Sequence, residues 1–260
     1  LSSFSLGPDH QVLLTWSDPM APIHEAARSG DDETLRRLLA EGVSPNAVDI
    51  DDDEPNAWDD IEEPLRQTPL HVLCRDCPKD RSGRVACFEL LRDAGANLEA
   101  KDARDYRPLH FSALRADVEM VSLLIQAGVN VNGGPGGFTP LAQAAQSYLG
   151  SAYDCAELLV KAGAAVNVRG QGGWTPLALA LNRGQRRIWP LLLRAGAEIP
   201  GYYSPMPNPY IVRVQSAGGF KKYAQNHLAA MTKLFAANGR RLPPEVVRQI
   251  MEFWLHLGCY

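Results

Sequence analysis

The feature of this sequence that most restricts its fold is a pattern that occurs five times: a proline, an apolar stretch with helical spacing, and a closing glycine. The prolines that open the units are Pro22, Pro69, Pro108, Pro140 and Pro176, and the closing glycines are Gly42, Gly95, Gly128, Gly163 and Gly196. The last four glycines are separated by 33, 35 and 33 residues. A period of this size is typical of stacked helical repeats, in which one unit is too small to bury its own apolar face.

The residues around the prolines and glycines have physical reasons to recur. Threonine precedes the proline in three units, in Thr68-Pro69-Leu70, Thr139-Pro140-Leu141 and Thr175-Pro176-Leu177. Threonine is a good helix N-cap, and proline suits the first turn because its φ is fixed and it has no N–H to leave unpaired. Leu and Ala follow at helical spacing, and glycine can adopt the left-handed conformation that ends the second helix. Each unit is therefore predicted to be a pair of helices.

This pattern resembles the ankyrin repeat family over roughly residues 20–200. The resemblance implies an all-α solenoid of about five helix–turn–helix repeats, followed by a helical C-terminal extension. It also implies a structural role for His24, His71 and His110, which match the family histidine that ties neighbouring turns together. Within a repeat domain over 20–199, the repeats are expected at about 20–48, 65–97, 102–130, 134–165 and 170–198.

Composition limits the functional class. The chain has 260 residues, 45% of them hydrophobic, enough for one repeat domain and a tail. No apolar run approaches the length of a membrane span, and a net charge of −4 gives no reason to expect nucleic acid as a partner. Five cysteines at irregular spacings predict reduced thiols in an intracellular compartment. Because the sequence starts at Leu1, that compartment is cytoplasmic or, if a targeting segment was removed, organellar.

Two segments depart from the repeat period. Residues 1–19 lack helical spacing and are predicted to be an N-terminal arm that packs on the first repeat or lies on a partner. Pro22 and Pro69 are 47 residues apart, and the excess, residues 49–64, contains nine acidic side chains. Such an insertion is predicted to be a solvated loop. The alternative is a docking strip for a basic partner, with Trp58 and Ile61 as apolar anchors.

Catalytic and metal-binding patterns find little support. Cys74 and Cys77 have the spacing of a metal pair, but no second Cys-x-x-Cys follows, so they are predicted to be structural thiols in a long inner loop over 74–84. The glycine runs at 133–137 and 170–173 precede helix starts and are predicted to be finger turns rather than phosphate loops. No nucleophile elbow or zinc-protease motif is present. The sequence predicts neither an enzyme nor a bound metal or cofactor.

Protein binding is the predicted function. In the ankyrin family, the residue before the Thr-Pro position lies at a finger tip on the concave side that commonly meets partners. Aromatic residues are enriched in interfaces; the alternative is that each ring packs on the neighbouring finger. The predicted contact residues, at finger tips, on the third inner helix and in the acidic insertion, are Met20, Gln67, Tyr106, Phe138, Trp174, Phe111, Leu114 and Trp58. Such a surface predicts an adaptor, a scaffold or a built-in subunit of a larger multi-subunit complex, with the insertion steering a basic partner surface.

The C-terminal segment supplies a second hypothesis. After an irregular proline-rich connector, helices are predicted over 220–237 and 244–257, and residues 220–260 hold six Lys and Arg against two Glu, a balance of +4. The stretch from Leu242 to Ile250 resembles the first line of an F-box, and proline-rich starts also occur in the SOCS box. Proteins that join ankyrin repeats to such boxes recruit substrates to ubiquitin ligases. The candidate contacts of this tail are Leu242, Pro243, Pro244, Ile250 and Trp254. Only 16 residues follow Pro244, fewer than a full F-box, and the simpler interpretation is a helix that caps the last repeat.

Overall fold

The computed structural model describes residues 22–48, 65–76, 81–200 and 209–237, and the single residues Pro243, Glu245, Val246 and Gln249. The described elements are helices, as predicted, and these ranges contain no β-strand. The first helices of the five repeats are α1 (Pro22–Ser29), α3 (Pro69–Asp76), α5 (Pro108–Leu114), α7 (Pro140–Gln146) and α9 (Pro176–Asn182). Their second helices are α2 (Asp32–Ala40), α4 (Arg81–Asp93), α6 (Val118–Gln126), α8 (Ala152–Lys161) and α10 (Ile188–Arg194).

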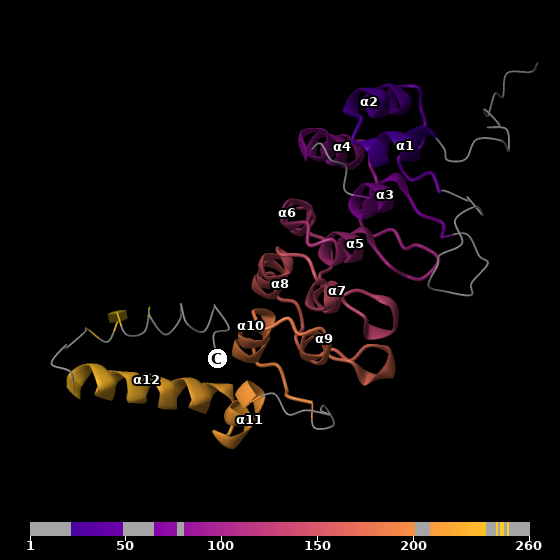
Figure 1. Cartoon of the computed structure of the whole chain (residues 1–260). Helices are drawn as coiled ribbons and strands as arrows, with labels where there is room; N and C mark the ends of the chain where they lie inside the picture. The colour runs from indigo at the N-terminus through magenta and orange to yellow at the C-terminus, as the bar shows by residue number, and fades with distance from the viewer. Residues whose placement is uncertain are drawn as a thin grey trace, which may run out of the picture.

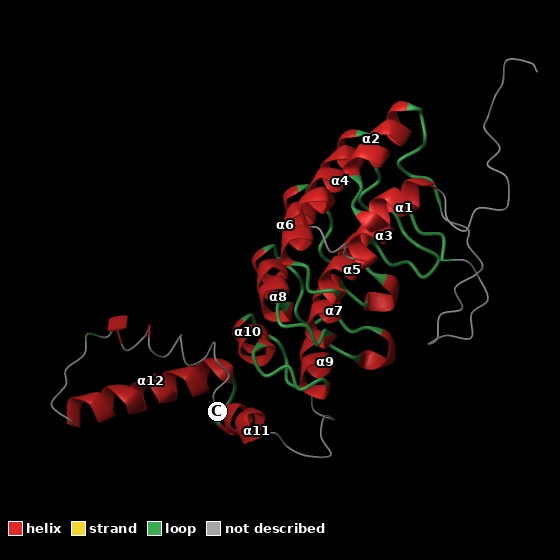
Figure 2. Cartoon of the chain, turned by 45° about the horizontal axis from the view of Figure 1, so that its top comes forward, coloured by secondary structure: helices red, strands yellow, loops and turns green. Residues whose placement is uncertain are grey.

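The repeats stack into a two-layered solenoid. The first helices form an inner layer and the second helices an outer layer, and both layers run from the N-terminal to the C-terminal repeat (Figure 1). The segments that join one repeat to the next project beyond the inner layer, which Figure 2 shows from a second direction. We call these segments fingers; the fully described ones are residues 96–107, 129–139 and 164–175. The last two contain the short 3-10 turns η1 (Pro135–Gly137) and η2 (Gln171–Gly173).

The core is continuous from repeat to repeat. The apolar residue after each opening proline is at most 2% exposed, in the order Ile23, Leu70, Leu109, Leu141 and Leu177. Leucines of the outer helices, Leu35, Leu91, Leu124, Leu159 and Leu192, are fully buried against them. Burying one such side chain contributes about 1.5–3 kcal/mol. Because these residues belong to different repeats, most of this stabilisation exists only in the stack.

The helix ends follow the sequence pattern. Thr139 and Thr175 cap α7 and α9 by accepting the N–H groups of Ala142 and Ala178 at 3.4 and 3.2 Å. The five closing glycines have φ between 81° and 91°. A side chain there would meet no neighbouring atom, so glycine is required for the left-handed backbone and not for space. The Thr-Pro start and the glycine stop therefore act as predicted.

An asparagine ladder joins the turns that follow the outer helices. Asn167 Nδ2 donates to the Gly196 carbonyl at 3.0 Å, and its Oδ1 accepts the N–H of Glu198 at 2.8 Å. Asn132 makes the same pair of bonds to the fourth repeat, and Asn46 makes it to the second repeat. Each asparagine thus donates to one repeat and accepts from it, which fixes the spacing between the two turns.

The junction between repeats two and three replaces this amide by a carboxylate. Glu99 stands at the ladder position, accepts the N–H of Asn130, and forms an ion pair with Arg107 Nη1 at 3.0 Å. In the outer layer of the same junction, the buried Arg84 of α4 bonds Asp117, the N-cap of α6, with Nη2 to Oδ1 at 3.1 Å. This junction is therefore held by ionic contacts in both places.

The second repeat corrects one prediction. The long inner loop expected over 74–84 is shorter, because α3 ends at Asp76 and α4 begins at Arg81. Cys74 and Cys87 are fully buried in the core, as structural thiols should be, whereas Cys77 lies outside the described residues. Burial raises the pKa of the Cys87 thiol to about 12. Within the described ranges, no cluster of His, Cys, Asp and Glu side chains has the arrangement of a metal site.

The C-terminal extension begins earlier than predicted. A helix that the sequence analysis assigned to the connector, α11 (Pro209–Ser216), precedes α12 (Phe220–Ala237), whose bounds were predicted correctly. Tyr210 of α11 packs edge-on against Tyr223 of α12, with ring centroids 5.7 Å apart. From there α12 extends away from the stack (Figure 1). The predicted helix over 244–257 lies almost entirely outside the described residues, and none of the described helices is long and apolar enough to cross a membrane.

Removing one ladder asparagine tests its contribution to stacking. We expect Asn167→Ala to lower the free energy of unfolding by about 1–2 kcal/mol, because two hydrogen bonds between repeats are lost. Urea denaturation followed by circular dichroism measures this change. The control is Asn226→Ala on the exposed side of α12, which should change stability by less than about 0.5 kcal/mol. Equal effects of both variants would show that the two hydrogen bonds of Asn167 contribute nothing measurable to stacking.

Candidate protein-binding surface

Three buried histidines fix the backbone of the finger tips. Nε2 of His24 lies 3.0 Å from the carbonyl oxygen of Gln67, and the same atom of His71 and of His110 lies 3.1 Å from the carbonyls of Tyr106 and Phe138. Nδ1 of His71 accepts the Thr68 N–H at 3.2 Å, so the proton sits on Nε2, which donates to the carbonyl. The predicted structural role of the three histidines is confirmed.

The carbonyls that these histidines hold belong to residues predicted as partner contacts. Tyr106 and Phe138 lie in successive fingers, and their rings meet edge to face with centroids 6.5 Å apart. The Tyr106 ring also lies 6.1 Å from Phe111 of α5. We call these three half-buried rings the aromatic row. Each ring packs on a neighbouring finger or helix, as the alternative interpretation held, and each keeps an exposed part.

Glycines let the fingers approach closely beneath this row. A Cβ at Gly170 would lie 3.1 Å from the Phe138 ring, and one at Gly137 would lie 2.4 Å from the carbonyl oxygen of Arg169. The predicted role of these glycine runs as finger turns is confirmed by positive φ at Gly136 and Gly172. A larger residue at either contact would push neighbouring fingers apart. The aromatic row thus rests on a closely packed backbone.

The other predicted contacts differ in exposure. Leu114 lies at the C-terminal end of α5 and is 36% exposed. Few other large hydrophobic side chains among the described residues are exposed. Trp174 is half-buried and packs against the core from the finger over residues 164–175. Gln67 is 3% exposed and accepts a hydrogen bond from Arg75. Its side chain is therefore buried beneath the predicted contact surface and does not form part of it. Met20 and Trp58 lie outside the described residues, as do Leu242, Pro244, Ile250 and Trp254; Pro243 is exposed.

A charged network flanks the apolar centre at repeats one and two. Asp76 accepts from Arg75 at 2.9 Å and from Arg28 at 3.0 Å, at the C-terminal ends of α3 and α1. Burial alone would raise the pKa of Asp76, but the hydrogen bonds and charges of the two arginines outweigh it and hold the pKa below its usual value. The sequence analysis did not single out Asp76, whose partner Arg28 is 48 residues away in the chain.

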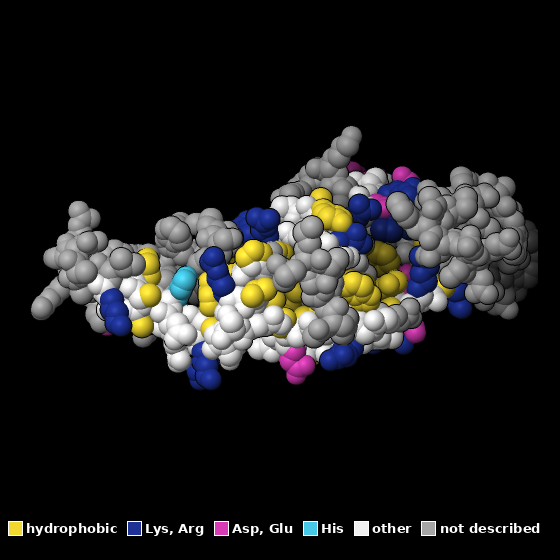
Figure 3. All heavy atoms as spheres, turned by 60° about the horizontal axis from the view of Figure 1, so that its bottom comes forward, with side chains coloured by type: hydrophobic (Ala, Val, Ile, Leu, Met, Phe, Trp, Pro, Cys, Tyr) yellow, Lys and Arg dark blue, Asp and Glu magenta, His cyan; other side chains and the backbone are white. Residues whose placement is uncertain are grey.

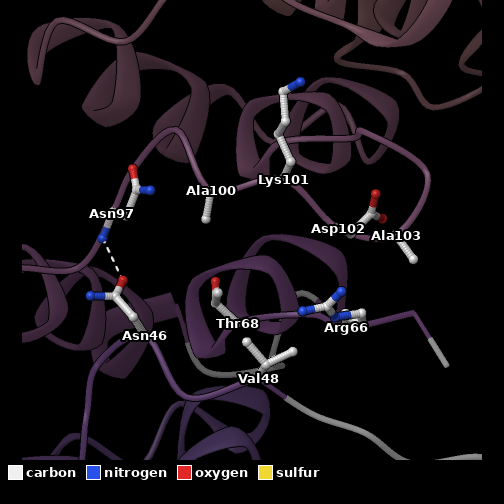
Figure 4. A pocket seen from close by; sticks show the side chains of 9 residues that line it. All are labelled: Asn46, Val48, Arg66, Thr68, Asn97, Ala100, Lys101, Asp102 and Ala103. Atoms are coloured by element: carbon white, nitrogen blue, oxygen red, sulfur yellow. Dashed lines mark hydrogen bonds between the residues drawn. The ribbon is translucent and has the colours of Figure 1, made fainter.

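A pocket of about 530 Å³ lies between the first two fingers. Its walls are Asn46, Val48, Arg66, Thr68, Asn97, Ala100, Lys101, Asp102 and Ala103 (Figure 4). Asp102 is buried, which raises its pKa, and its Oδ1 accepts the N–H groups of Arg104 and Tyr106. It therefore shapes the turn that leads to Tyr106. An Asp four residues before a finger tip was the available sequence signal, and the sequence analysis missed it.

Hydrophobic and basic side chains are neighbours on the surface of the molecule. Figure 3 shows one face on which hydrophobic side chains lie among Lys and Arg, while few Asp and Glu are visible among the described residues. Arg and aromatic residues are the types enriched in protein interfaces. The finger tips and the inner layer together form a surface that we call the finger face.

A stack of helical hairpins that presents such a surface defines the class of helical repeat scaffolds, which act by binding other macromolecules. Comparison with known proteins agrees. A family model described as "Ankyrin repeats (3 copies)" matches residues 81–170, and one described as "Ankyrin repeat" matches residues 20–50. The chain belongs to the ankyrin repeat family, whose members are generally protein–protein interaction modules and not enzymes.

Relatives match different shares of the chain. "Ankyrin repeat and SOCS box protein 5" of Oryctolagus cuniculus is 33% identical over 112 residues, which are 43% of this chain and 28% of that protein. "Ankyrin repeat and SOCS box protein 10" of Homo sapiens is 32% identical over 198 residues, which cover 75% of this chain and 36% of that protein. "Putative ankyrin repeat protein YahD" of Escherichia coli (strain K12) is 28% identical over 217 residues, 79% of this chain and 93% of that protein. The chain thus spans only about a third of the length of the two SOCS box relatives.

The buried histidines predict a loss of stability in mild acid. Burial lowers the pKa of His71 and of His110 from 6.5 to about 4 in the folded state. Between these values the unfolded chain binds protons that the folded chain does not, so stability is complete above pH 6.5 and falls as the pH falls toward 4. Going from pH 7.5 to 5.5 should lower the free energy of unfolding by about 1.4 kcal/mol per histidine.

Urea denaturation of the wild type and of His71→Gln/His110→Gln at both pH values measures this component. The variant should be less stable at pH 7.5 and should lose about 3 kcal/mol less than the wild type on acidification. An equal loss in both proteins would mean that other groups carry the pH dependence.

Proposed function

We propose that this protein binds a protein partner through the finger face, with the third repeat at the centre of the contact. The aromatic row of Tyr106, Phe111 and Phe138 carries this proposal. Its rings are half-buried, and two of them have their backbone carbonyls held by buried histidines. A surface whose side chains are already ordered loses little conformational entropy on binding, so more of the contact energy appears as affinity.

The surroundings of the row fit the usual anatomy of an interface. Leu114 extends the apolar area one turn beyond Phe111 on α5. The network of Arg28, Arg75 and Asp76 lies on the N-terminal side, and the amide side chains of Gln146 and Asn182 occupy the matching places of repeats four and five. An apolar centre with a polar rim excludes water from the strongest contacts.

The chemistry of the partner follows from the acidic insertion. Val48 and Arg66, which lie on either side of the insertion in the sequence, both line the pocket beside the second finger. The insertion therefore leaves and rejoins the repeat stack at the finger face. Nine carboxylates attached there favour a partner with a basic surface, because complementary charge speeds encounter and fixes orientation. The protein would act as an adaptor, a scaffold or a built-in subunit of a larger complex.

A charge placed in the apolar centre tests the proposal. Leu114→Glu should weaken partner binding roughly tenfold or more, because a carboxylate would be buried against apolar partner atoms. Gln126→Glu is the matched control, since Leu114 and Gln126 are the last residues of α5 and α6, both exposed, and the helix-end penalty is the same. Affinity purification of both variants and the wild type from the native source, with mass spectrometry, identifies the partners.

The expected result is that specific proteins recovered with the wild type and with Gln126→Glu are lost with Leu114→Glu, while circular dichroism shows equal helix content. Recovery of the same proteins with all three chains would contradict a contact at the third repeat.

A second candidate function is that of a substrate receptor of a ubiquitin ligase, with the ligase contact in the C-terminal segment. The observation that favours it is the naming of several relatives as ankyrin repeat and SOCS box proteins. The stretch from Leu242 to Ile250 also favours this function, because it resembles the start of an F-box. In such a protein the repeats would hold the substrate and the tail would hold the ligase.

Deleting the tail separates the two functions. We expect the full chain to recover a cullin-family protein from the native source, and a chain that ends at Ala237 to lose the cullin while it keeps the partners of the finger face. Absence of a cullin from the full chain, or its retention by the shortened chain, would exclude this second function and leave the first unaffected.

A further inference from the structure

The loops that join the two helices of repeats four and five form a second exposed surface. The chain enters each inner helix from a finger, so the loop that follows the inner helix lies at the opposite end of the repeat. Residues 147–151 join α7 to α8, and residues 183–187 join α9 to α10. Tyr148 is 68% exposed and Leu149 is 49% exposed, the two highest values among the large hydrophobic residues that the structure describes as exposed.

Three contacts tie the loop 183–187 to the fourth repeat. Arg183 Nη1 donates to Tyr148 Oη at 2.7 Å, and the guanidinium carbon lies 5.3 Å from the centroid of the tyrosine ring. Gln185 donates to the carbonyl of Ser147. Arg187 stands over the ring of Tyr153, 5.1 Å from its centroid. Although Tyr148 is exposed, its position is therefore set by the next repeat.

The surface is basic in a chain of net negative charge. Arg183, Arg186 and Arg187 are exposed and stand within five residues, and within the described ranges none of them forms an ion pair with a carboxylate. The carboxylates near Tyr153 are Asp154 and Glu157, and Glu157 is paired with Lys161 at 3.1 Å. Guanidinium groups that have no carboxylate partner among the described residues, and that stand beside an exposed tyrosine and leucine, are suited to binding carboxylates with an apolar anchor.

We propose that the loops 147–151 and 183–187 are a docking surface for an acidic segment of a protein partner. Carboxylates of the segment would pair with Arg183 and Arg186, and an apolar side chain beside them would pack on Tyr148 and Leu149. A protein segment fits better than nucleic acid, because the exposed Tyr148 and Leu149 supply apolar area on which a side chain can pack.

Fluorescence anisotropy tests this surface with a dodecapeptide of Asp and Glu with one central Trp, titrated with the full chain. Arg183→Glu/Arg186→Glu should weaken binding by about tenfold or more, and Tyr148→Ala should weaken it several-fold. The matched control is Arg169→Glu in the finger over residues 164–175, which is also exposed and changes charge in the same sense. This control should bind within about twofold of the wild type. Raising the NaCl concentration should weaken binding to the wild type.

The outcomes distinguish this surface from the finger face. Unchanged binding by Arg183→Glu/Arg186→Glu, or no detectable binding of the peptide to the wild type, overturns the proposal. A loss with Arg169→Glu instead would assign the peptide to the finger face and also overturn it. Tighter binding of a single-stranded DNA dodecamer than of the peptide would assign the arginines to nucleic acid. None of these results bears on whether Leu114→Glu releases the native partner.

Discussion

The structure depends on the burial of each repeat's apolar face against its neighbours. Leu109 and Leu141, from successive repeats, are both almost fully buried, although neither belongs to a helix pair that could enclose it alone. Stability in such an array is the sum of modest intrinsic terms and interfaces between adjacent repeats. The same stacking of the repeats creates the finger face, because hairpins that are stacked in register also place Tyr106 and Phe138 in register.

The means of joining the repeats is not uniform. Asn46, Asn132 and Asn167 connect three junctions through neutral amides. At the second junction, Glu99 replaces the amide and pairs with Arg107, while in the outer layer Arg84 is buried against Asp117. A buried ion pair gains less net stability than its geometry suggests, since desolvation opposes the attraction. Arg84 contacts both Asp117 and Glu119 of the next repeat, so removing Asp117 would leave a buried guanidinium without its main partner.

Much of the fold was predictable, since the signals that determine it are local. A Thr-Pro start and a glycine stop each act within one turn, so helix ends such as Pro140 and Gly163 could be placed from the sequence. The histidine contacts were predicted because the resemblance gives a structural role to the histidine that follows the opening proline in the first three repeats. By contrast, the helix beginning at Pro209 was assigned to an irregular connector. The prolines before it obscure the apolar spacing of Tyr210, Ile211 and Val214.

The candidate site was predictable only in part. The sequence identified the aromatic finger tips, but not that Gln67 would be turned inward to Arg75, nor that Arg28 would meet Asp76. The separation of Arg28 and Asp76 includes the irregular insertion, so no fixed period reveals their contact, and the contact of Gln67 with Arg75 depends on how one side chain turns. The contact of Arg183 with Tyr148 was also missed, because it joins the loops 147–151 and 183–187, which lie outside the repeated proline and glycine pattern.

The ionic junction has a mechanical consequence. Repeat arrays open first at their weakest interface. Salt screens the half-buried pair of Glu99 and Arg107 in part but leaves a neutral amide bond nearly unchanged. Increasing ionic strength should therefore weaken this junction relative to the three that asparagines join. Because Tyr106 lies in the finger that joins repeats two and three, a partner that contacts both repeats would oppose the opening of this junction.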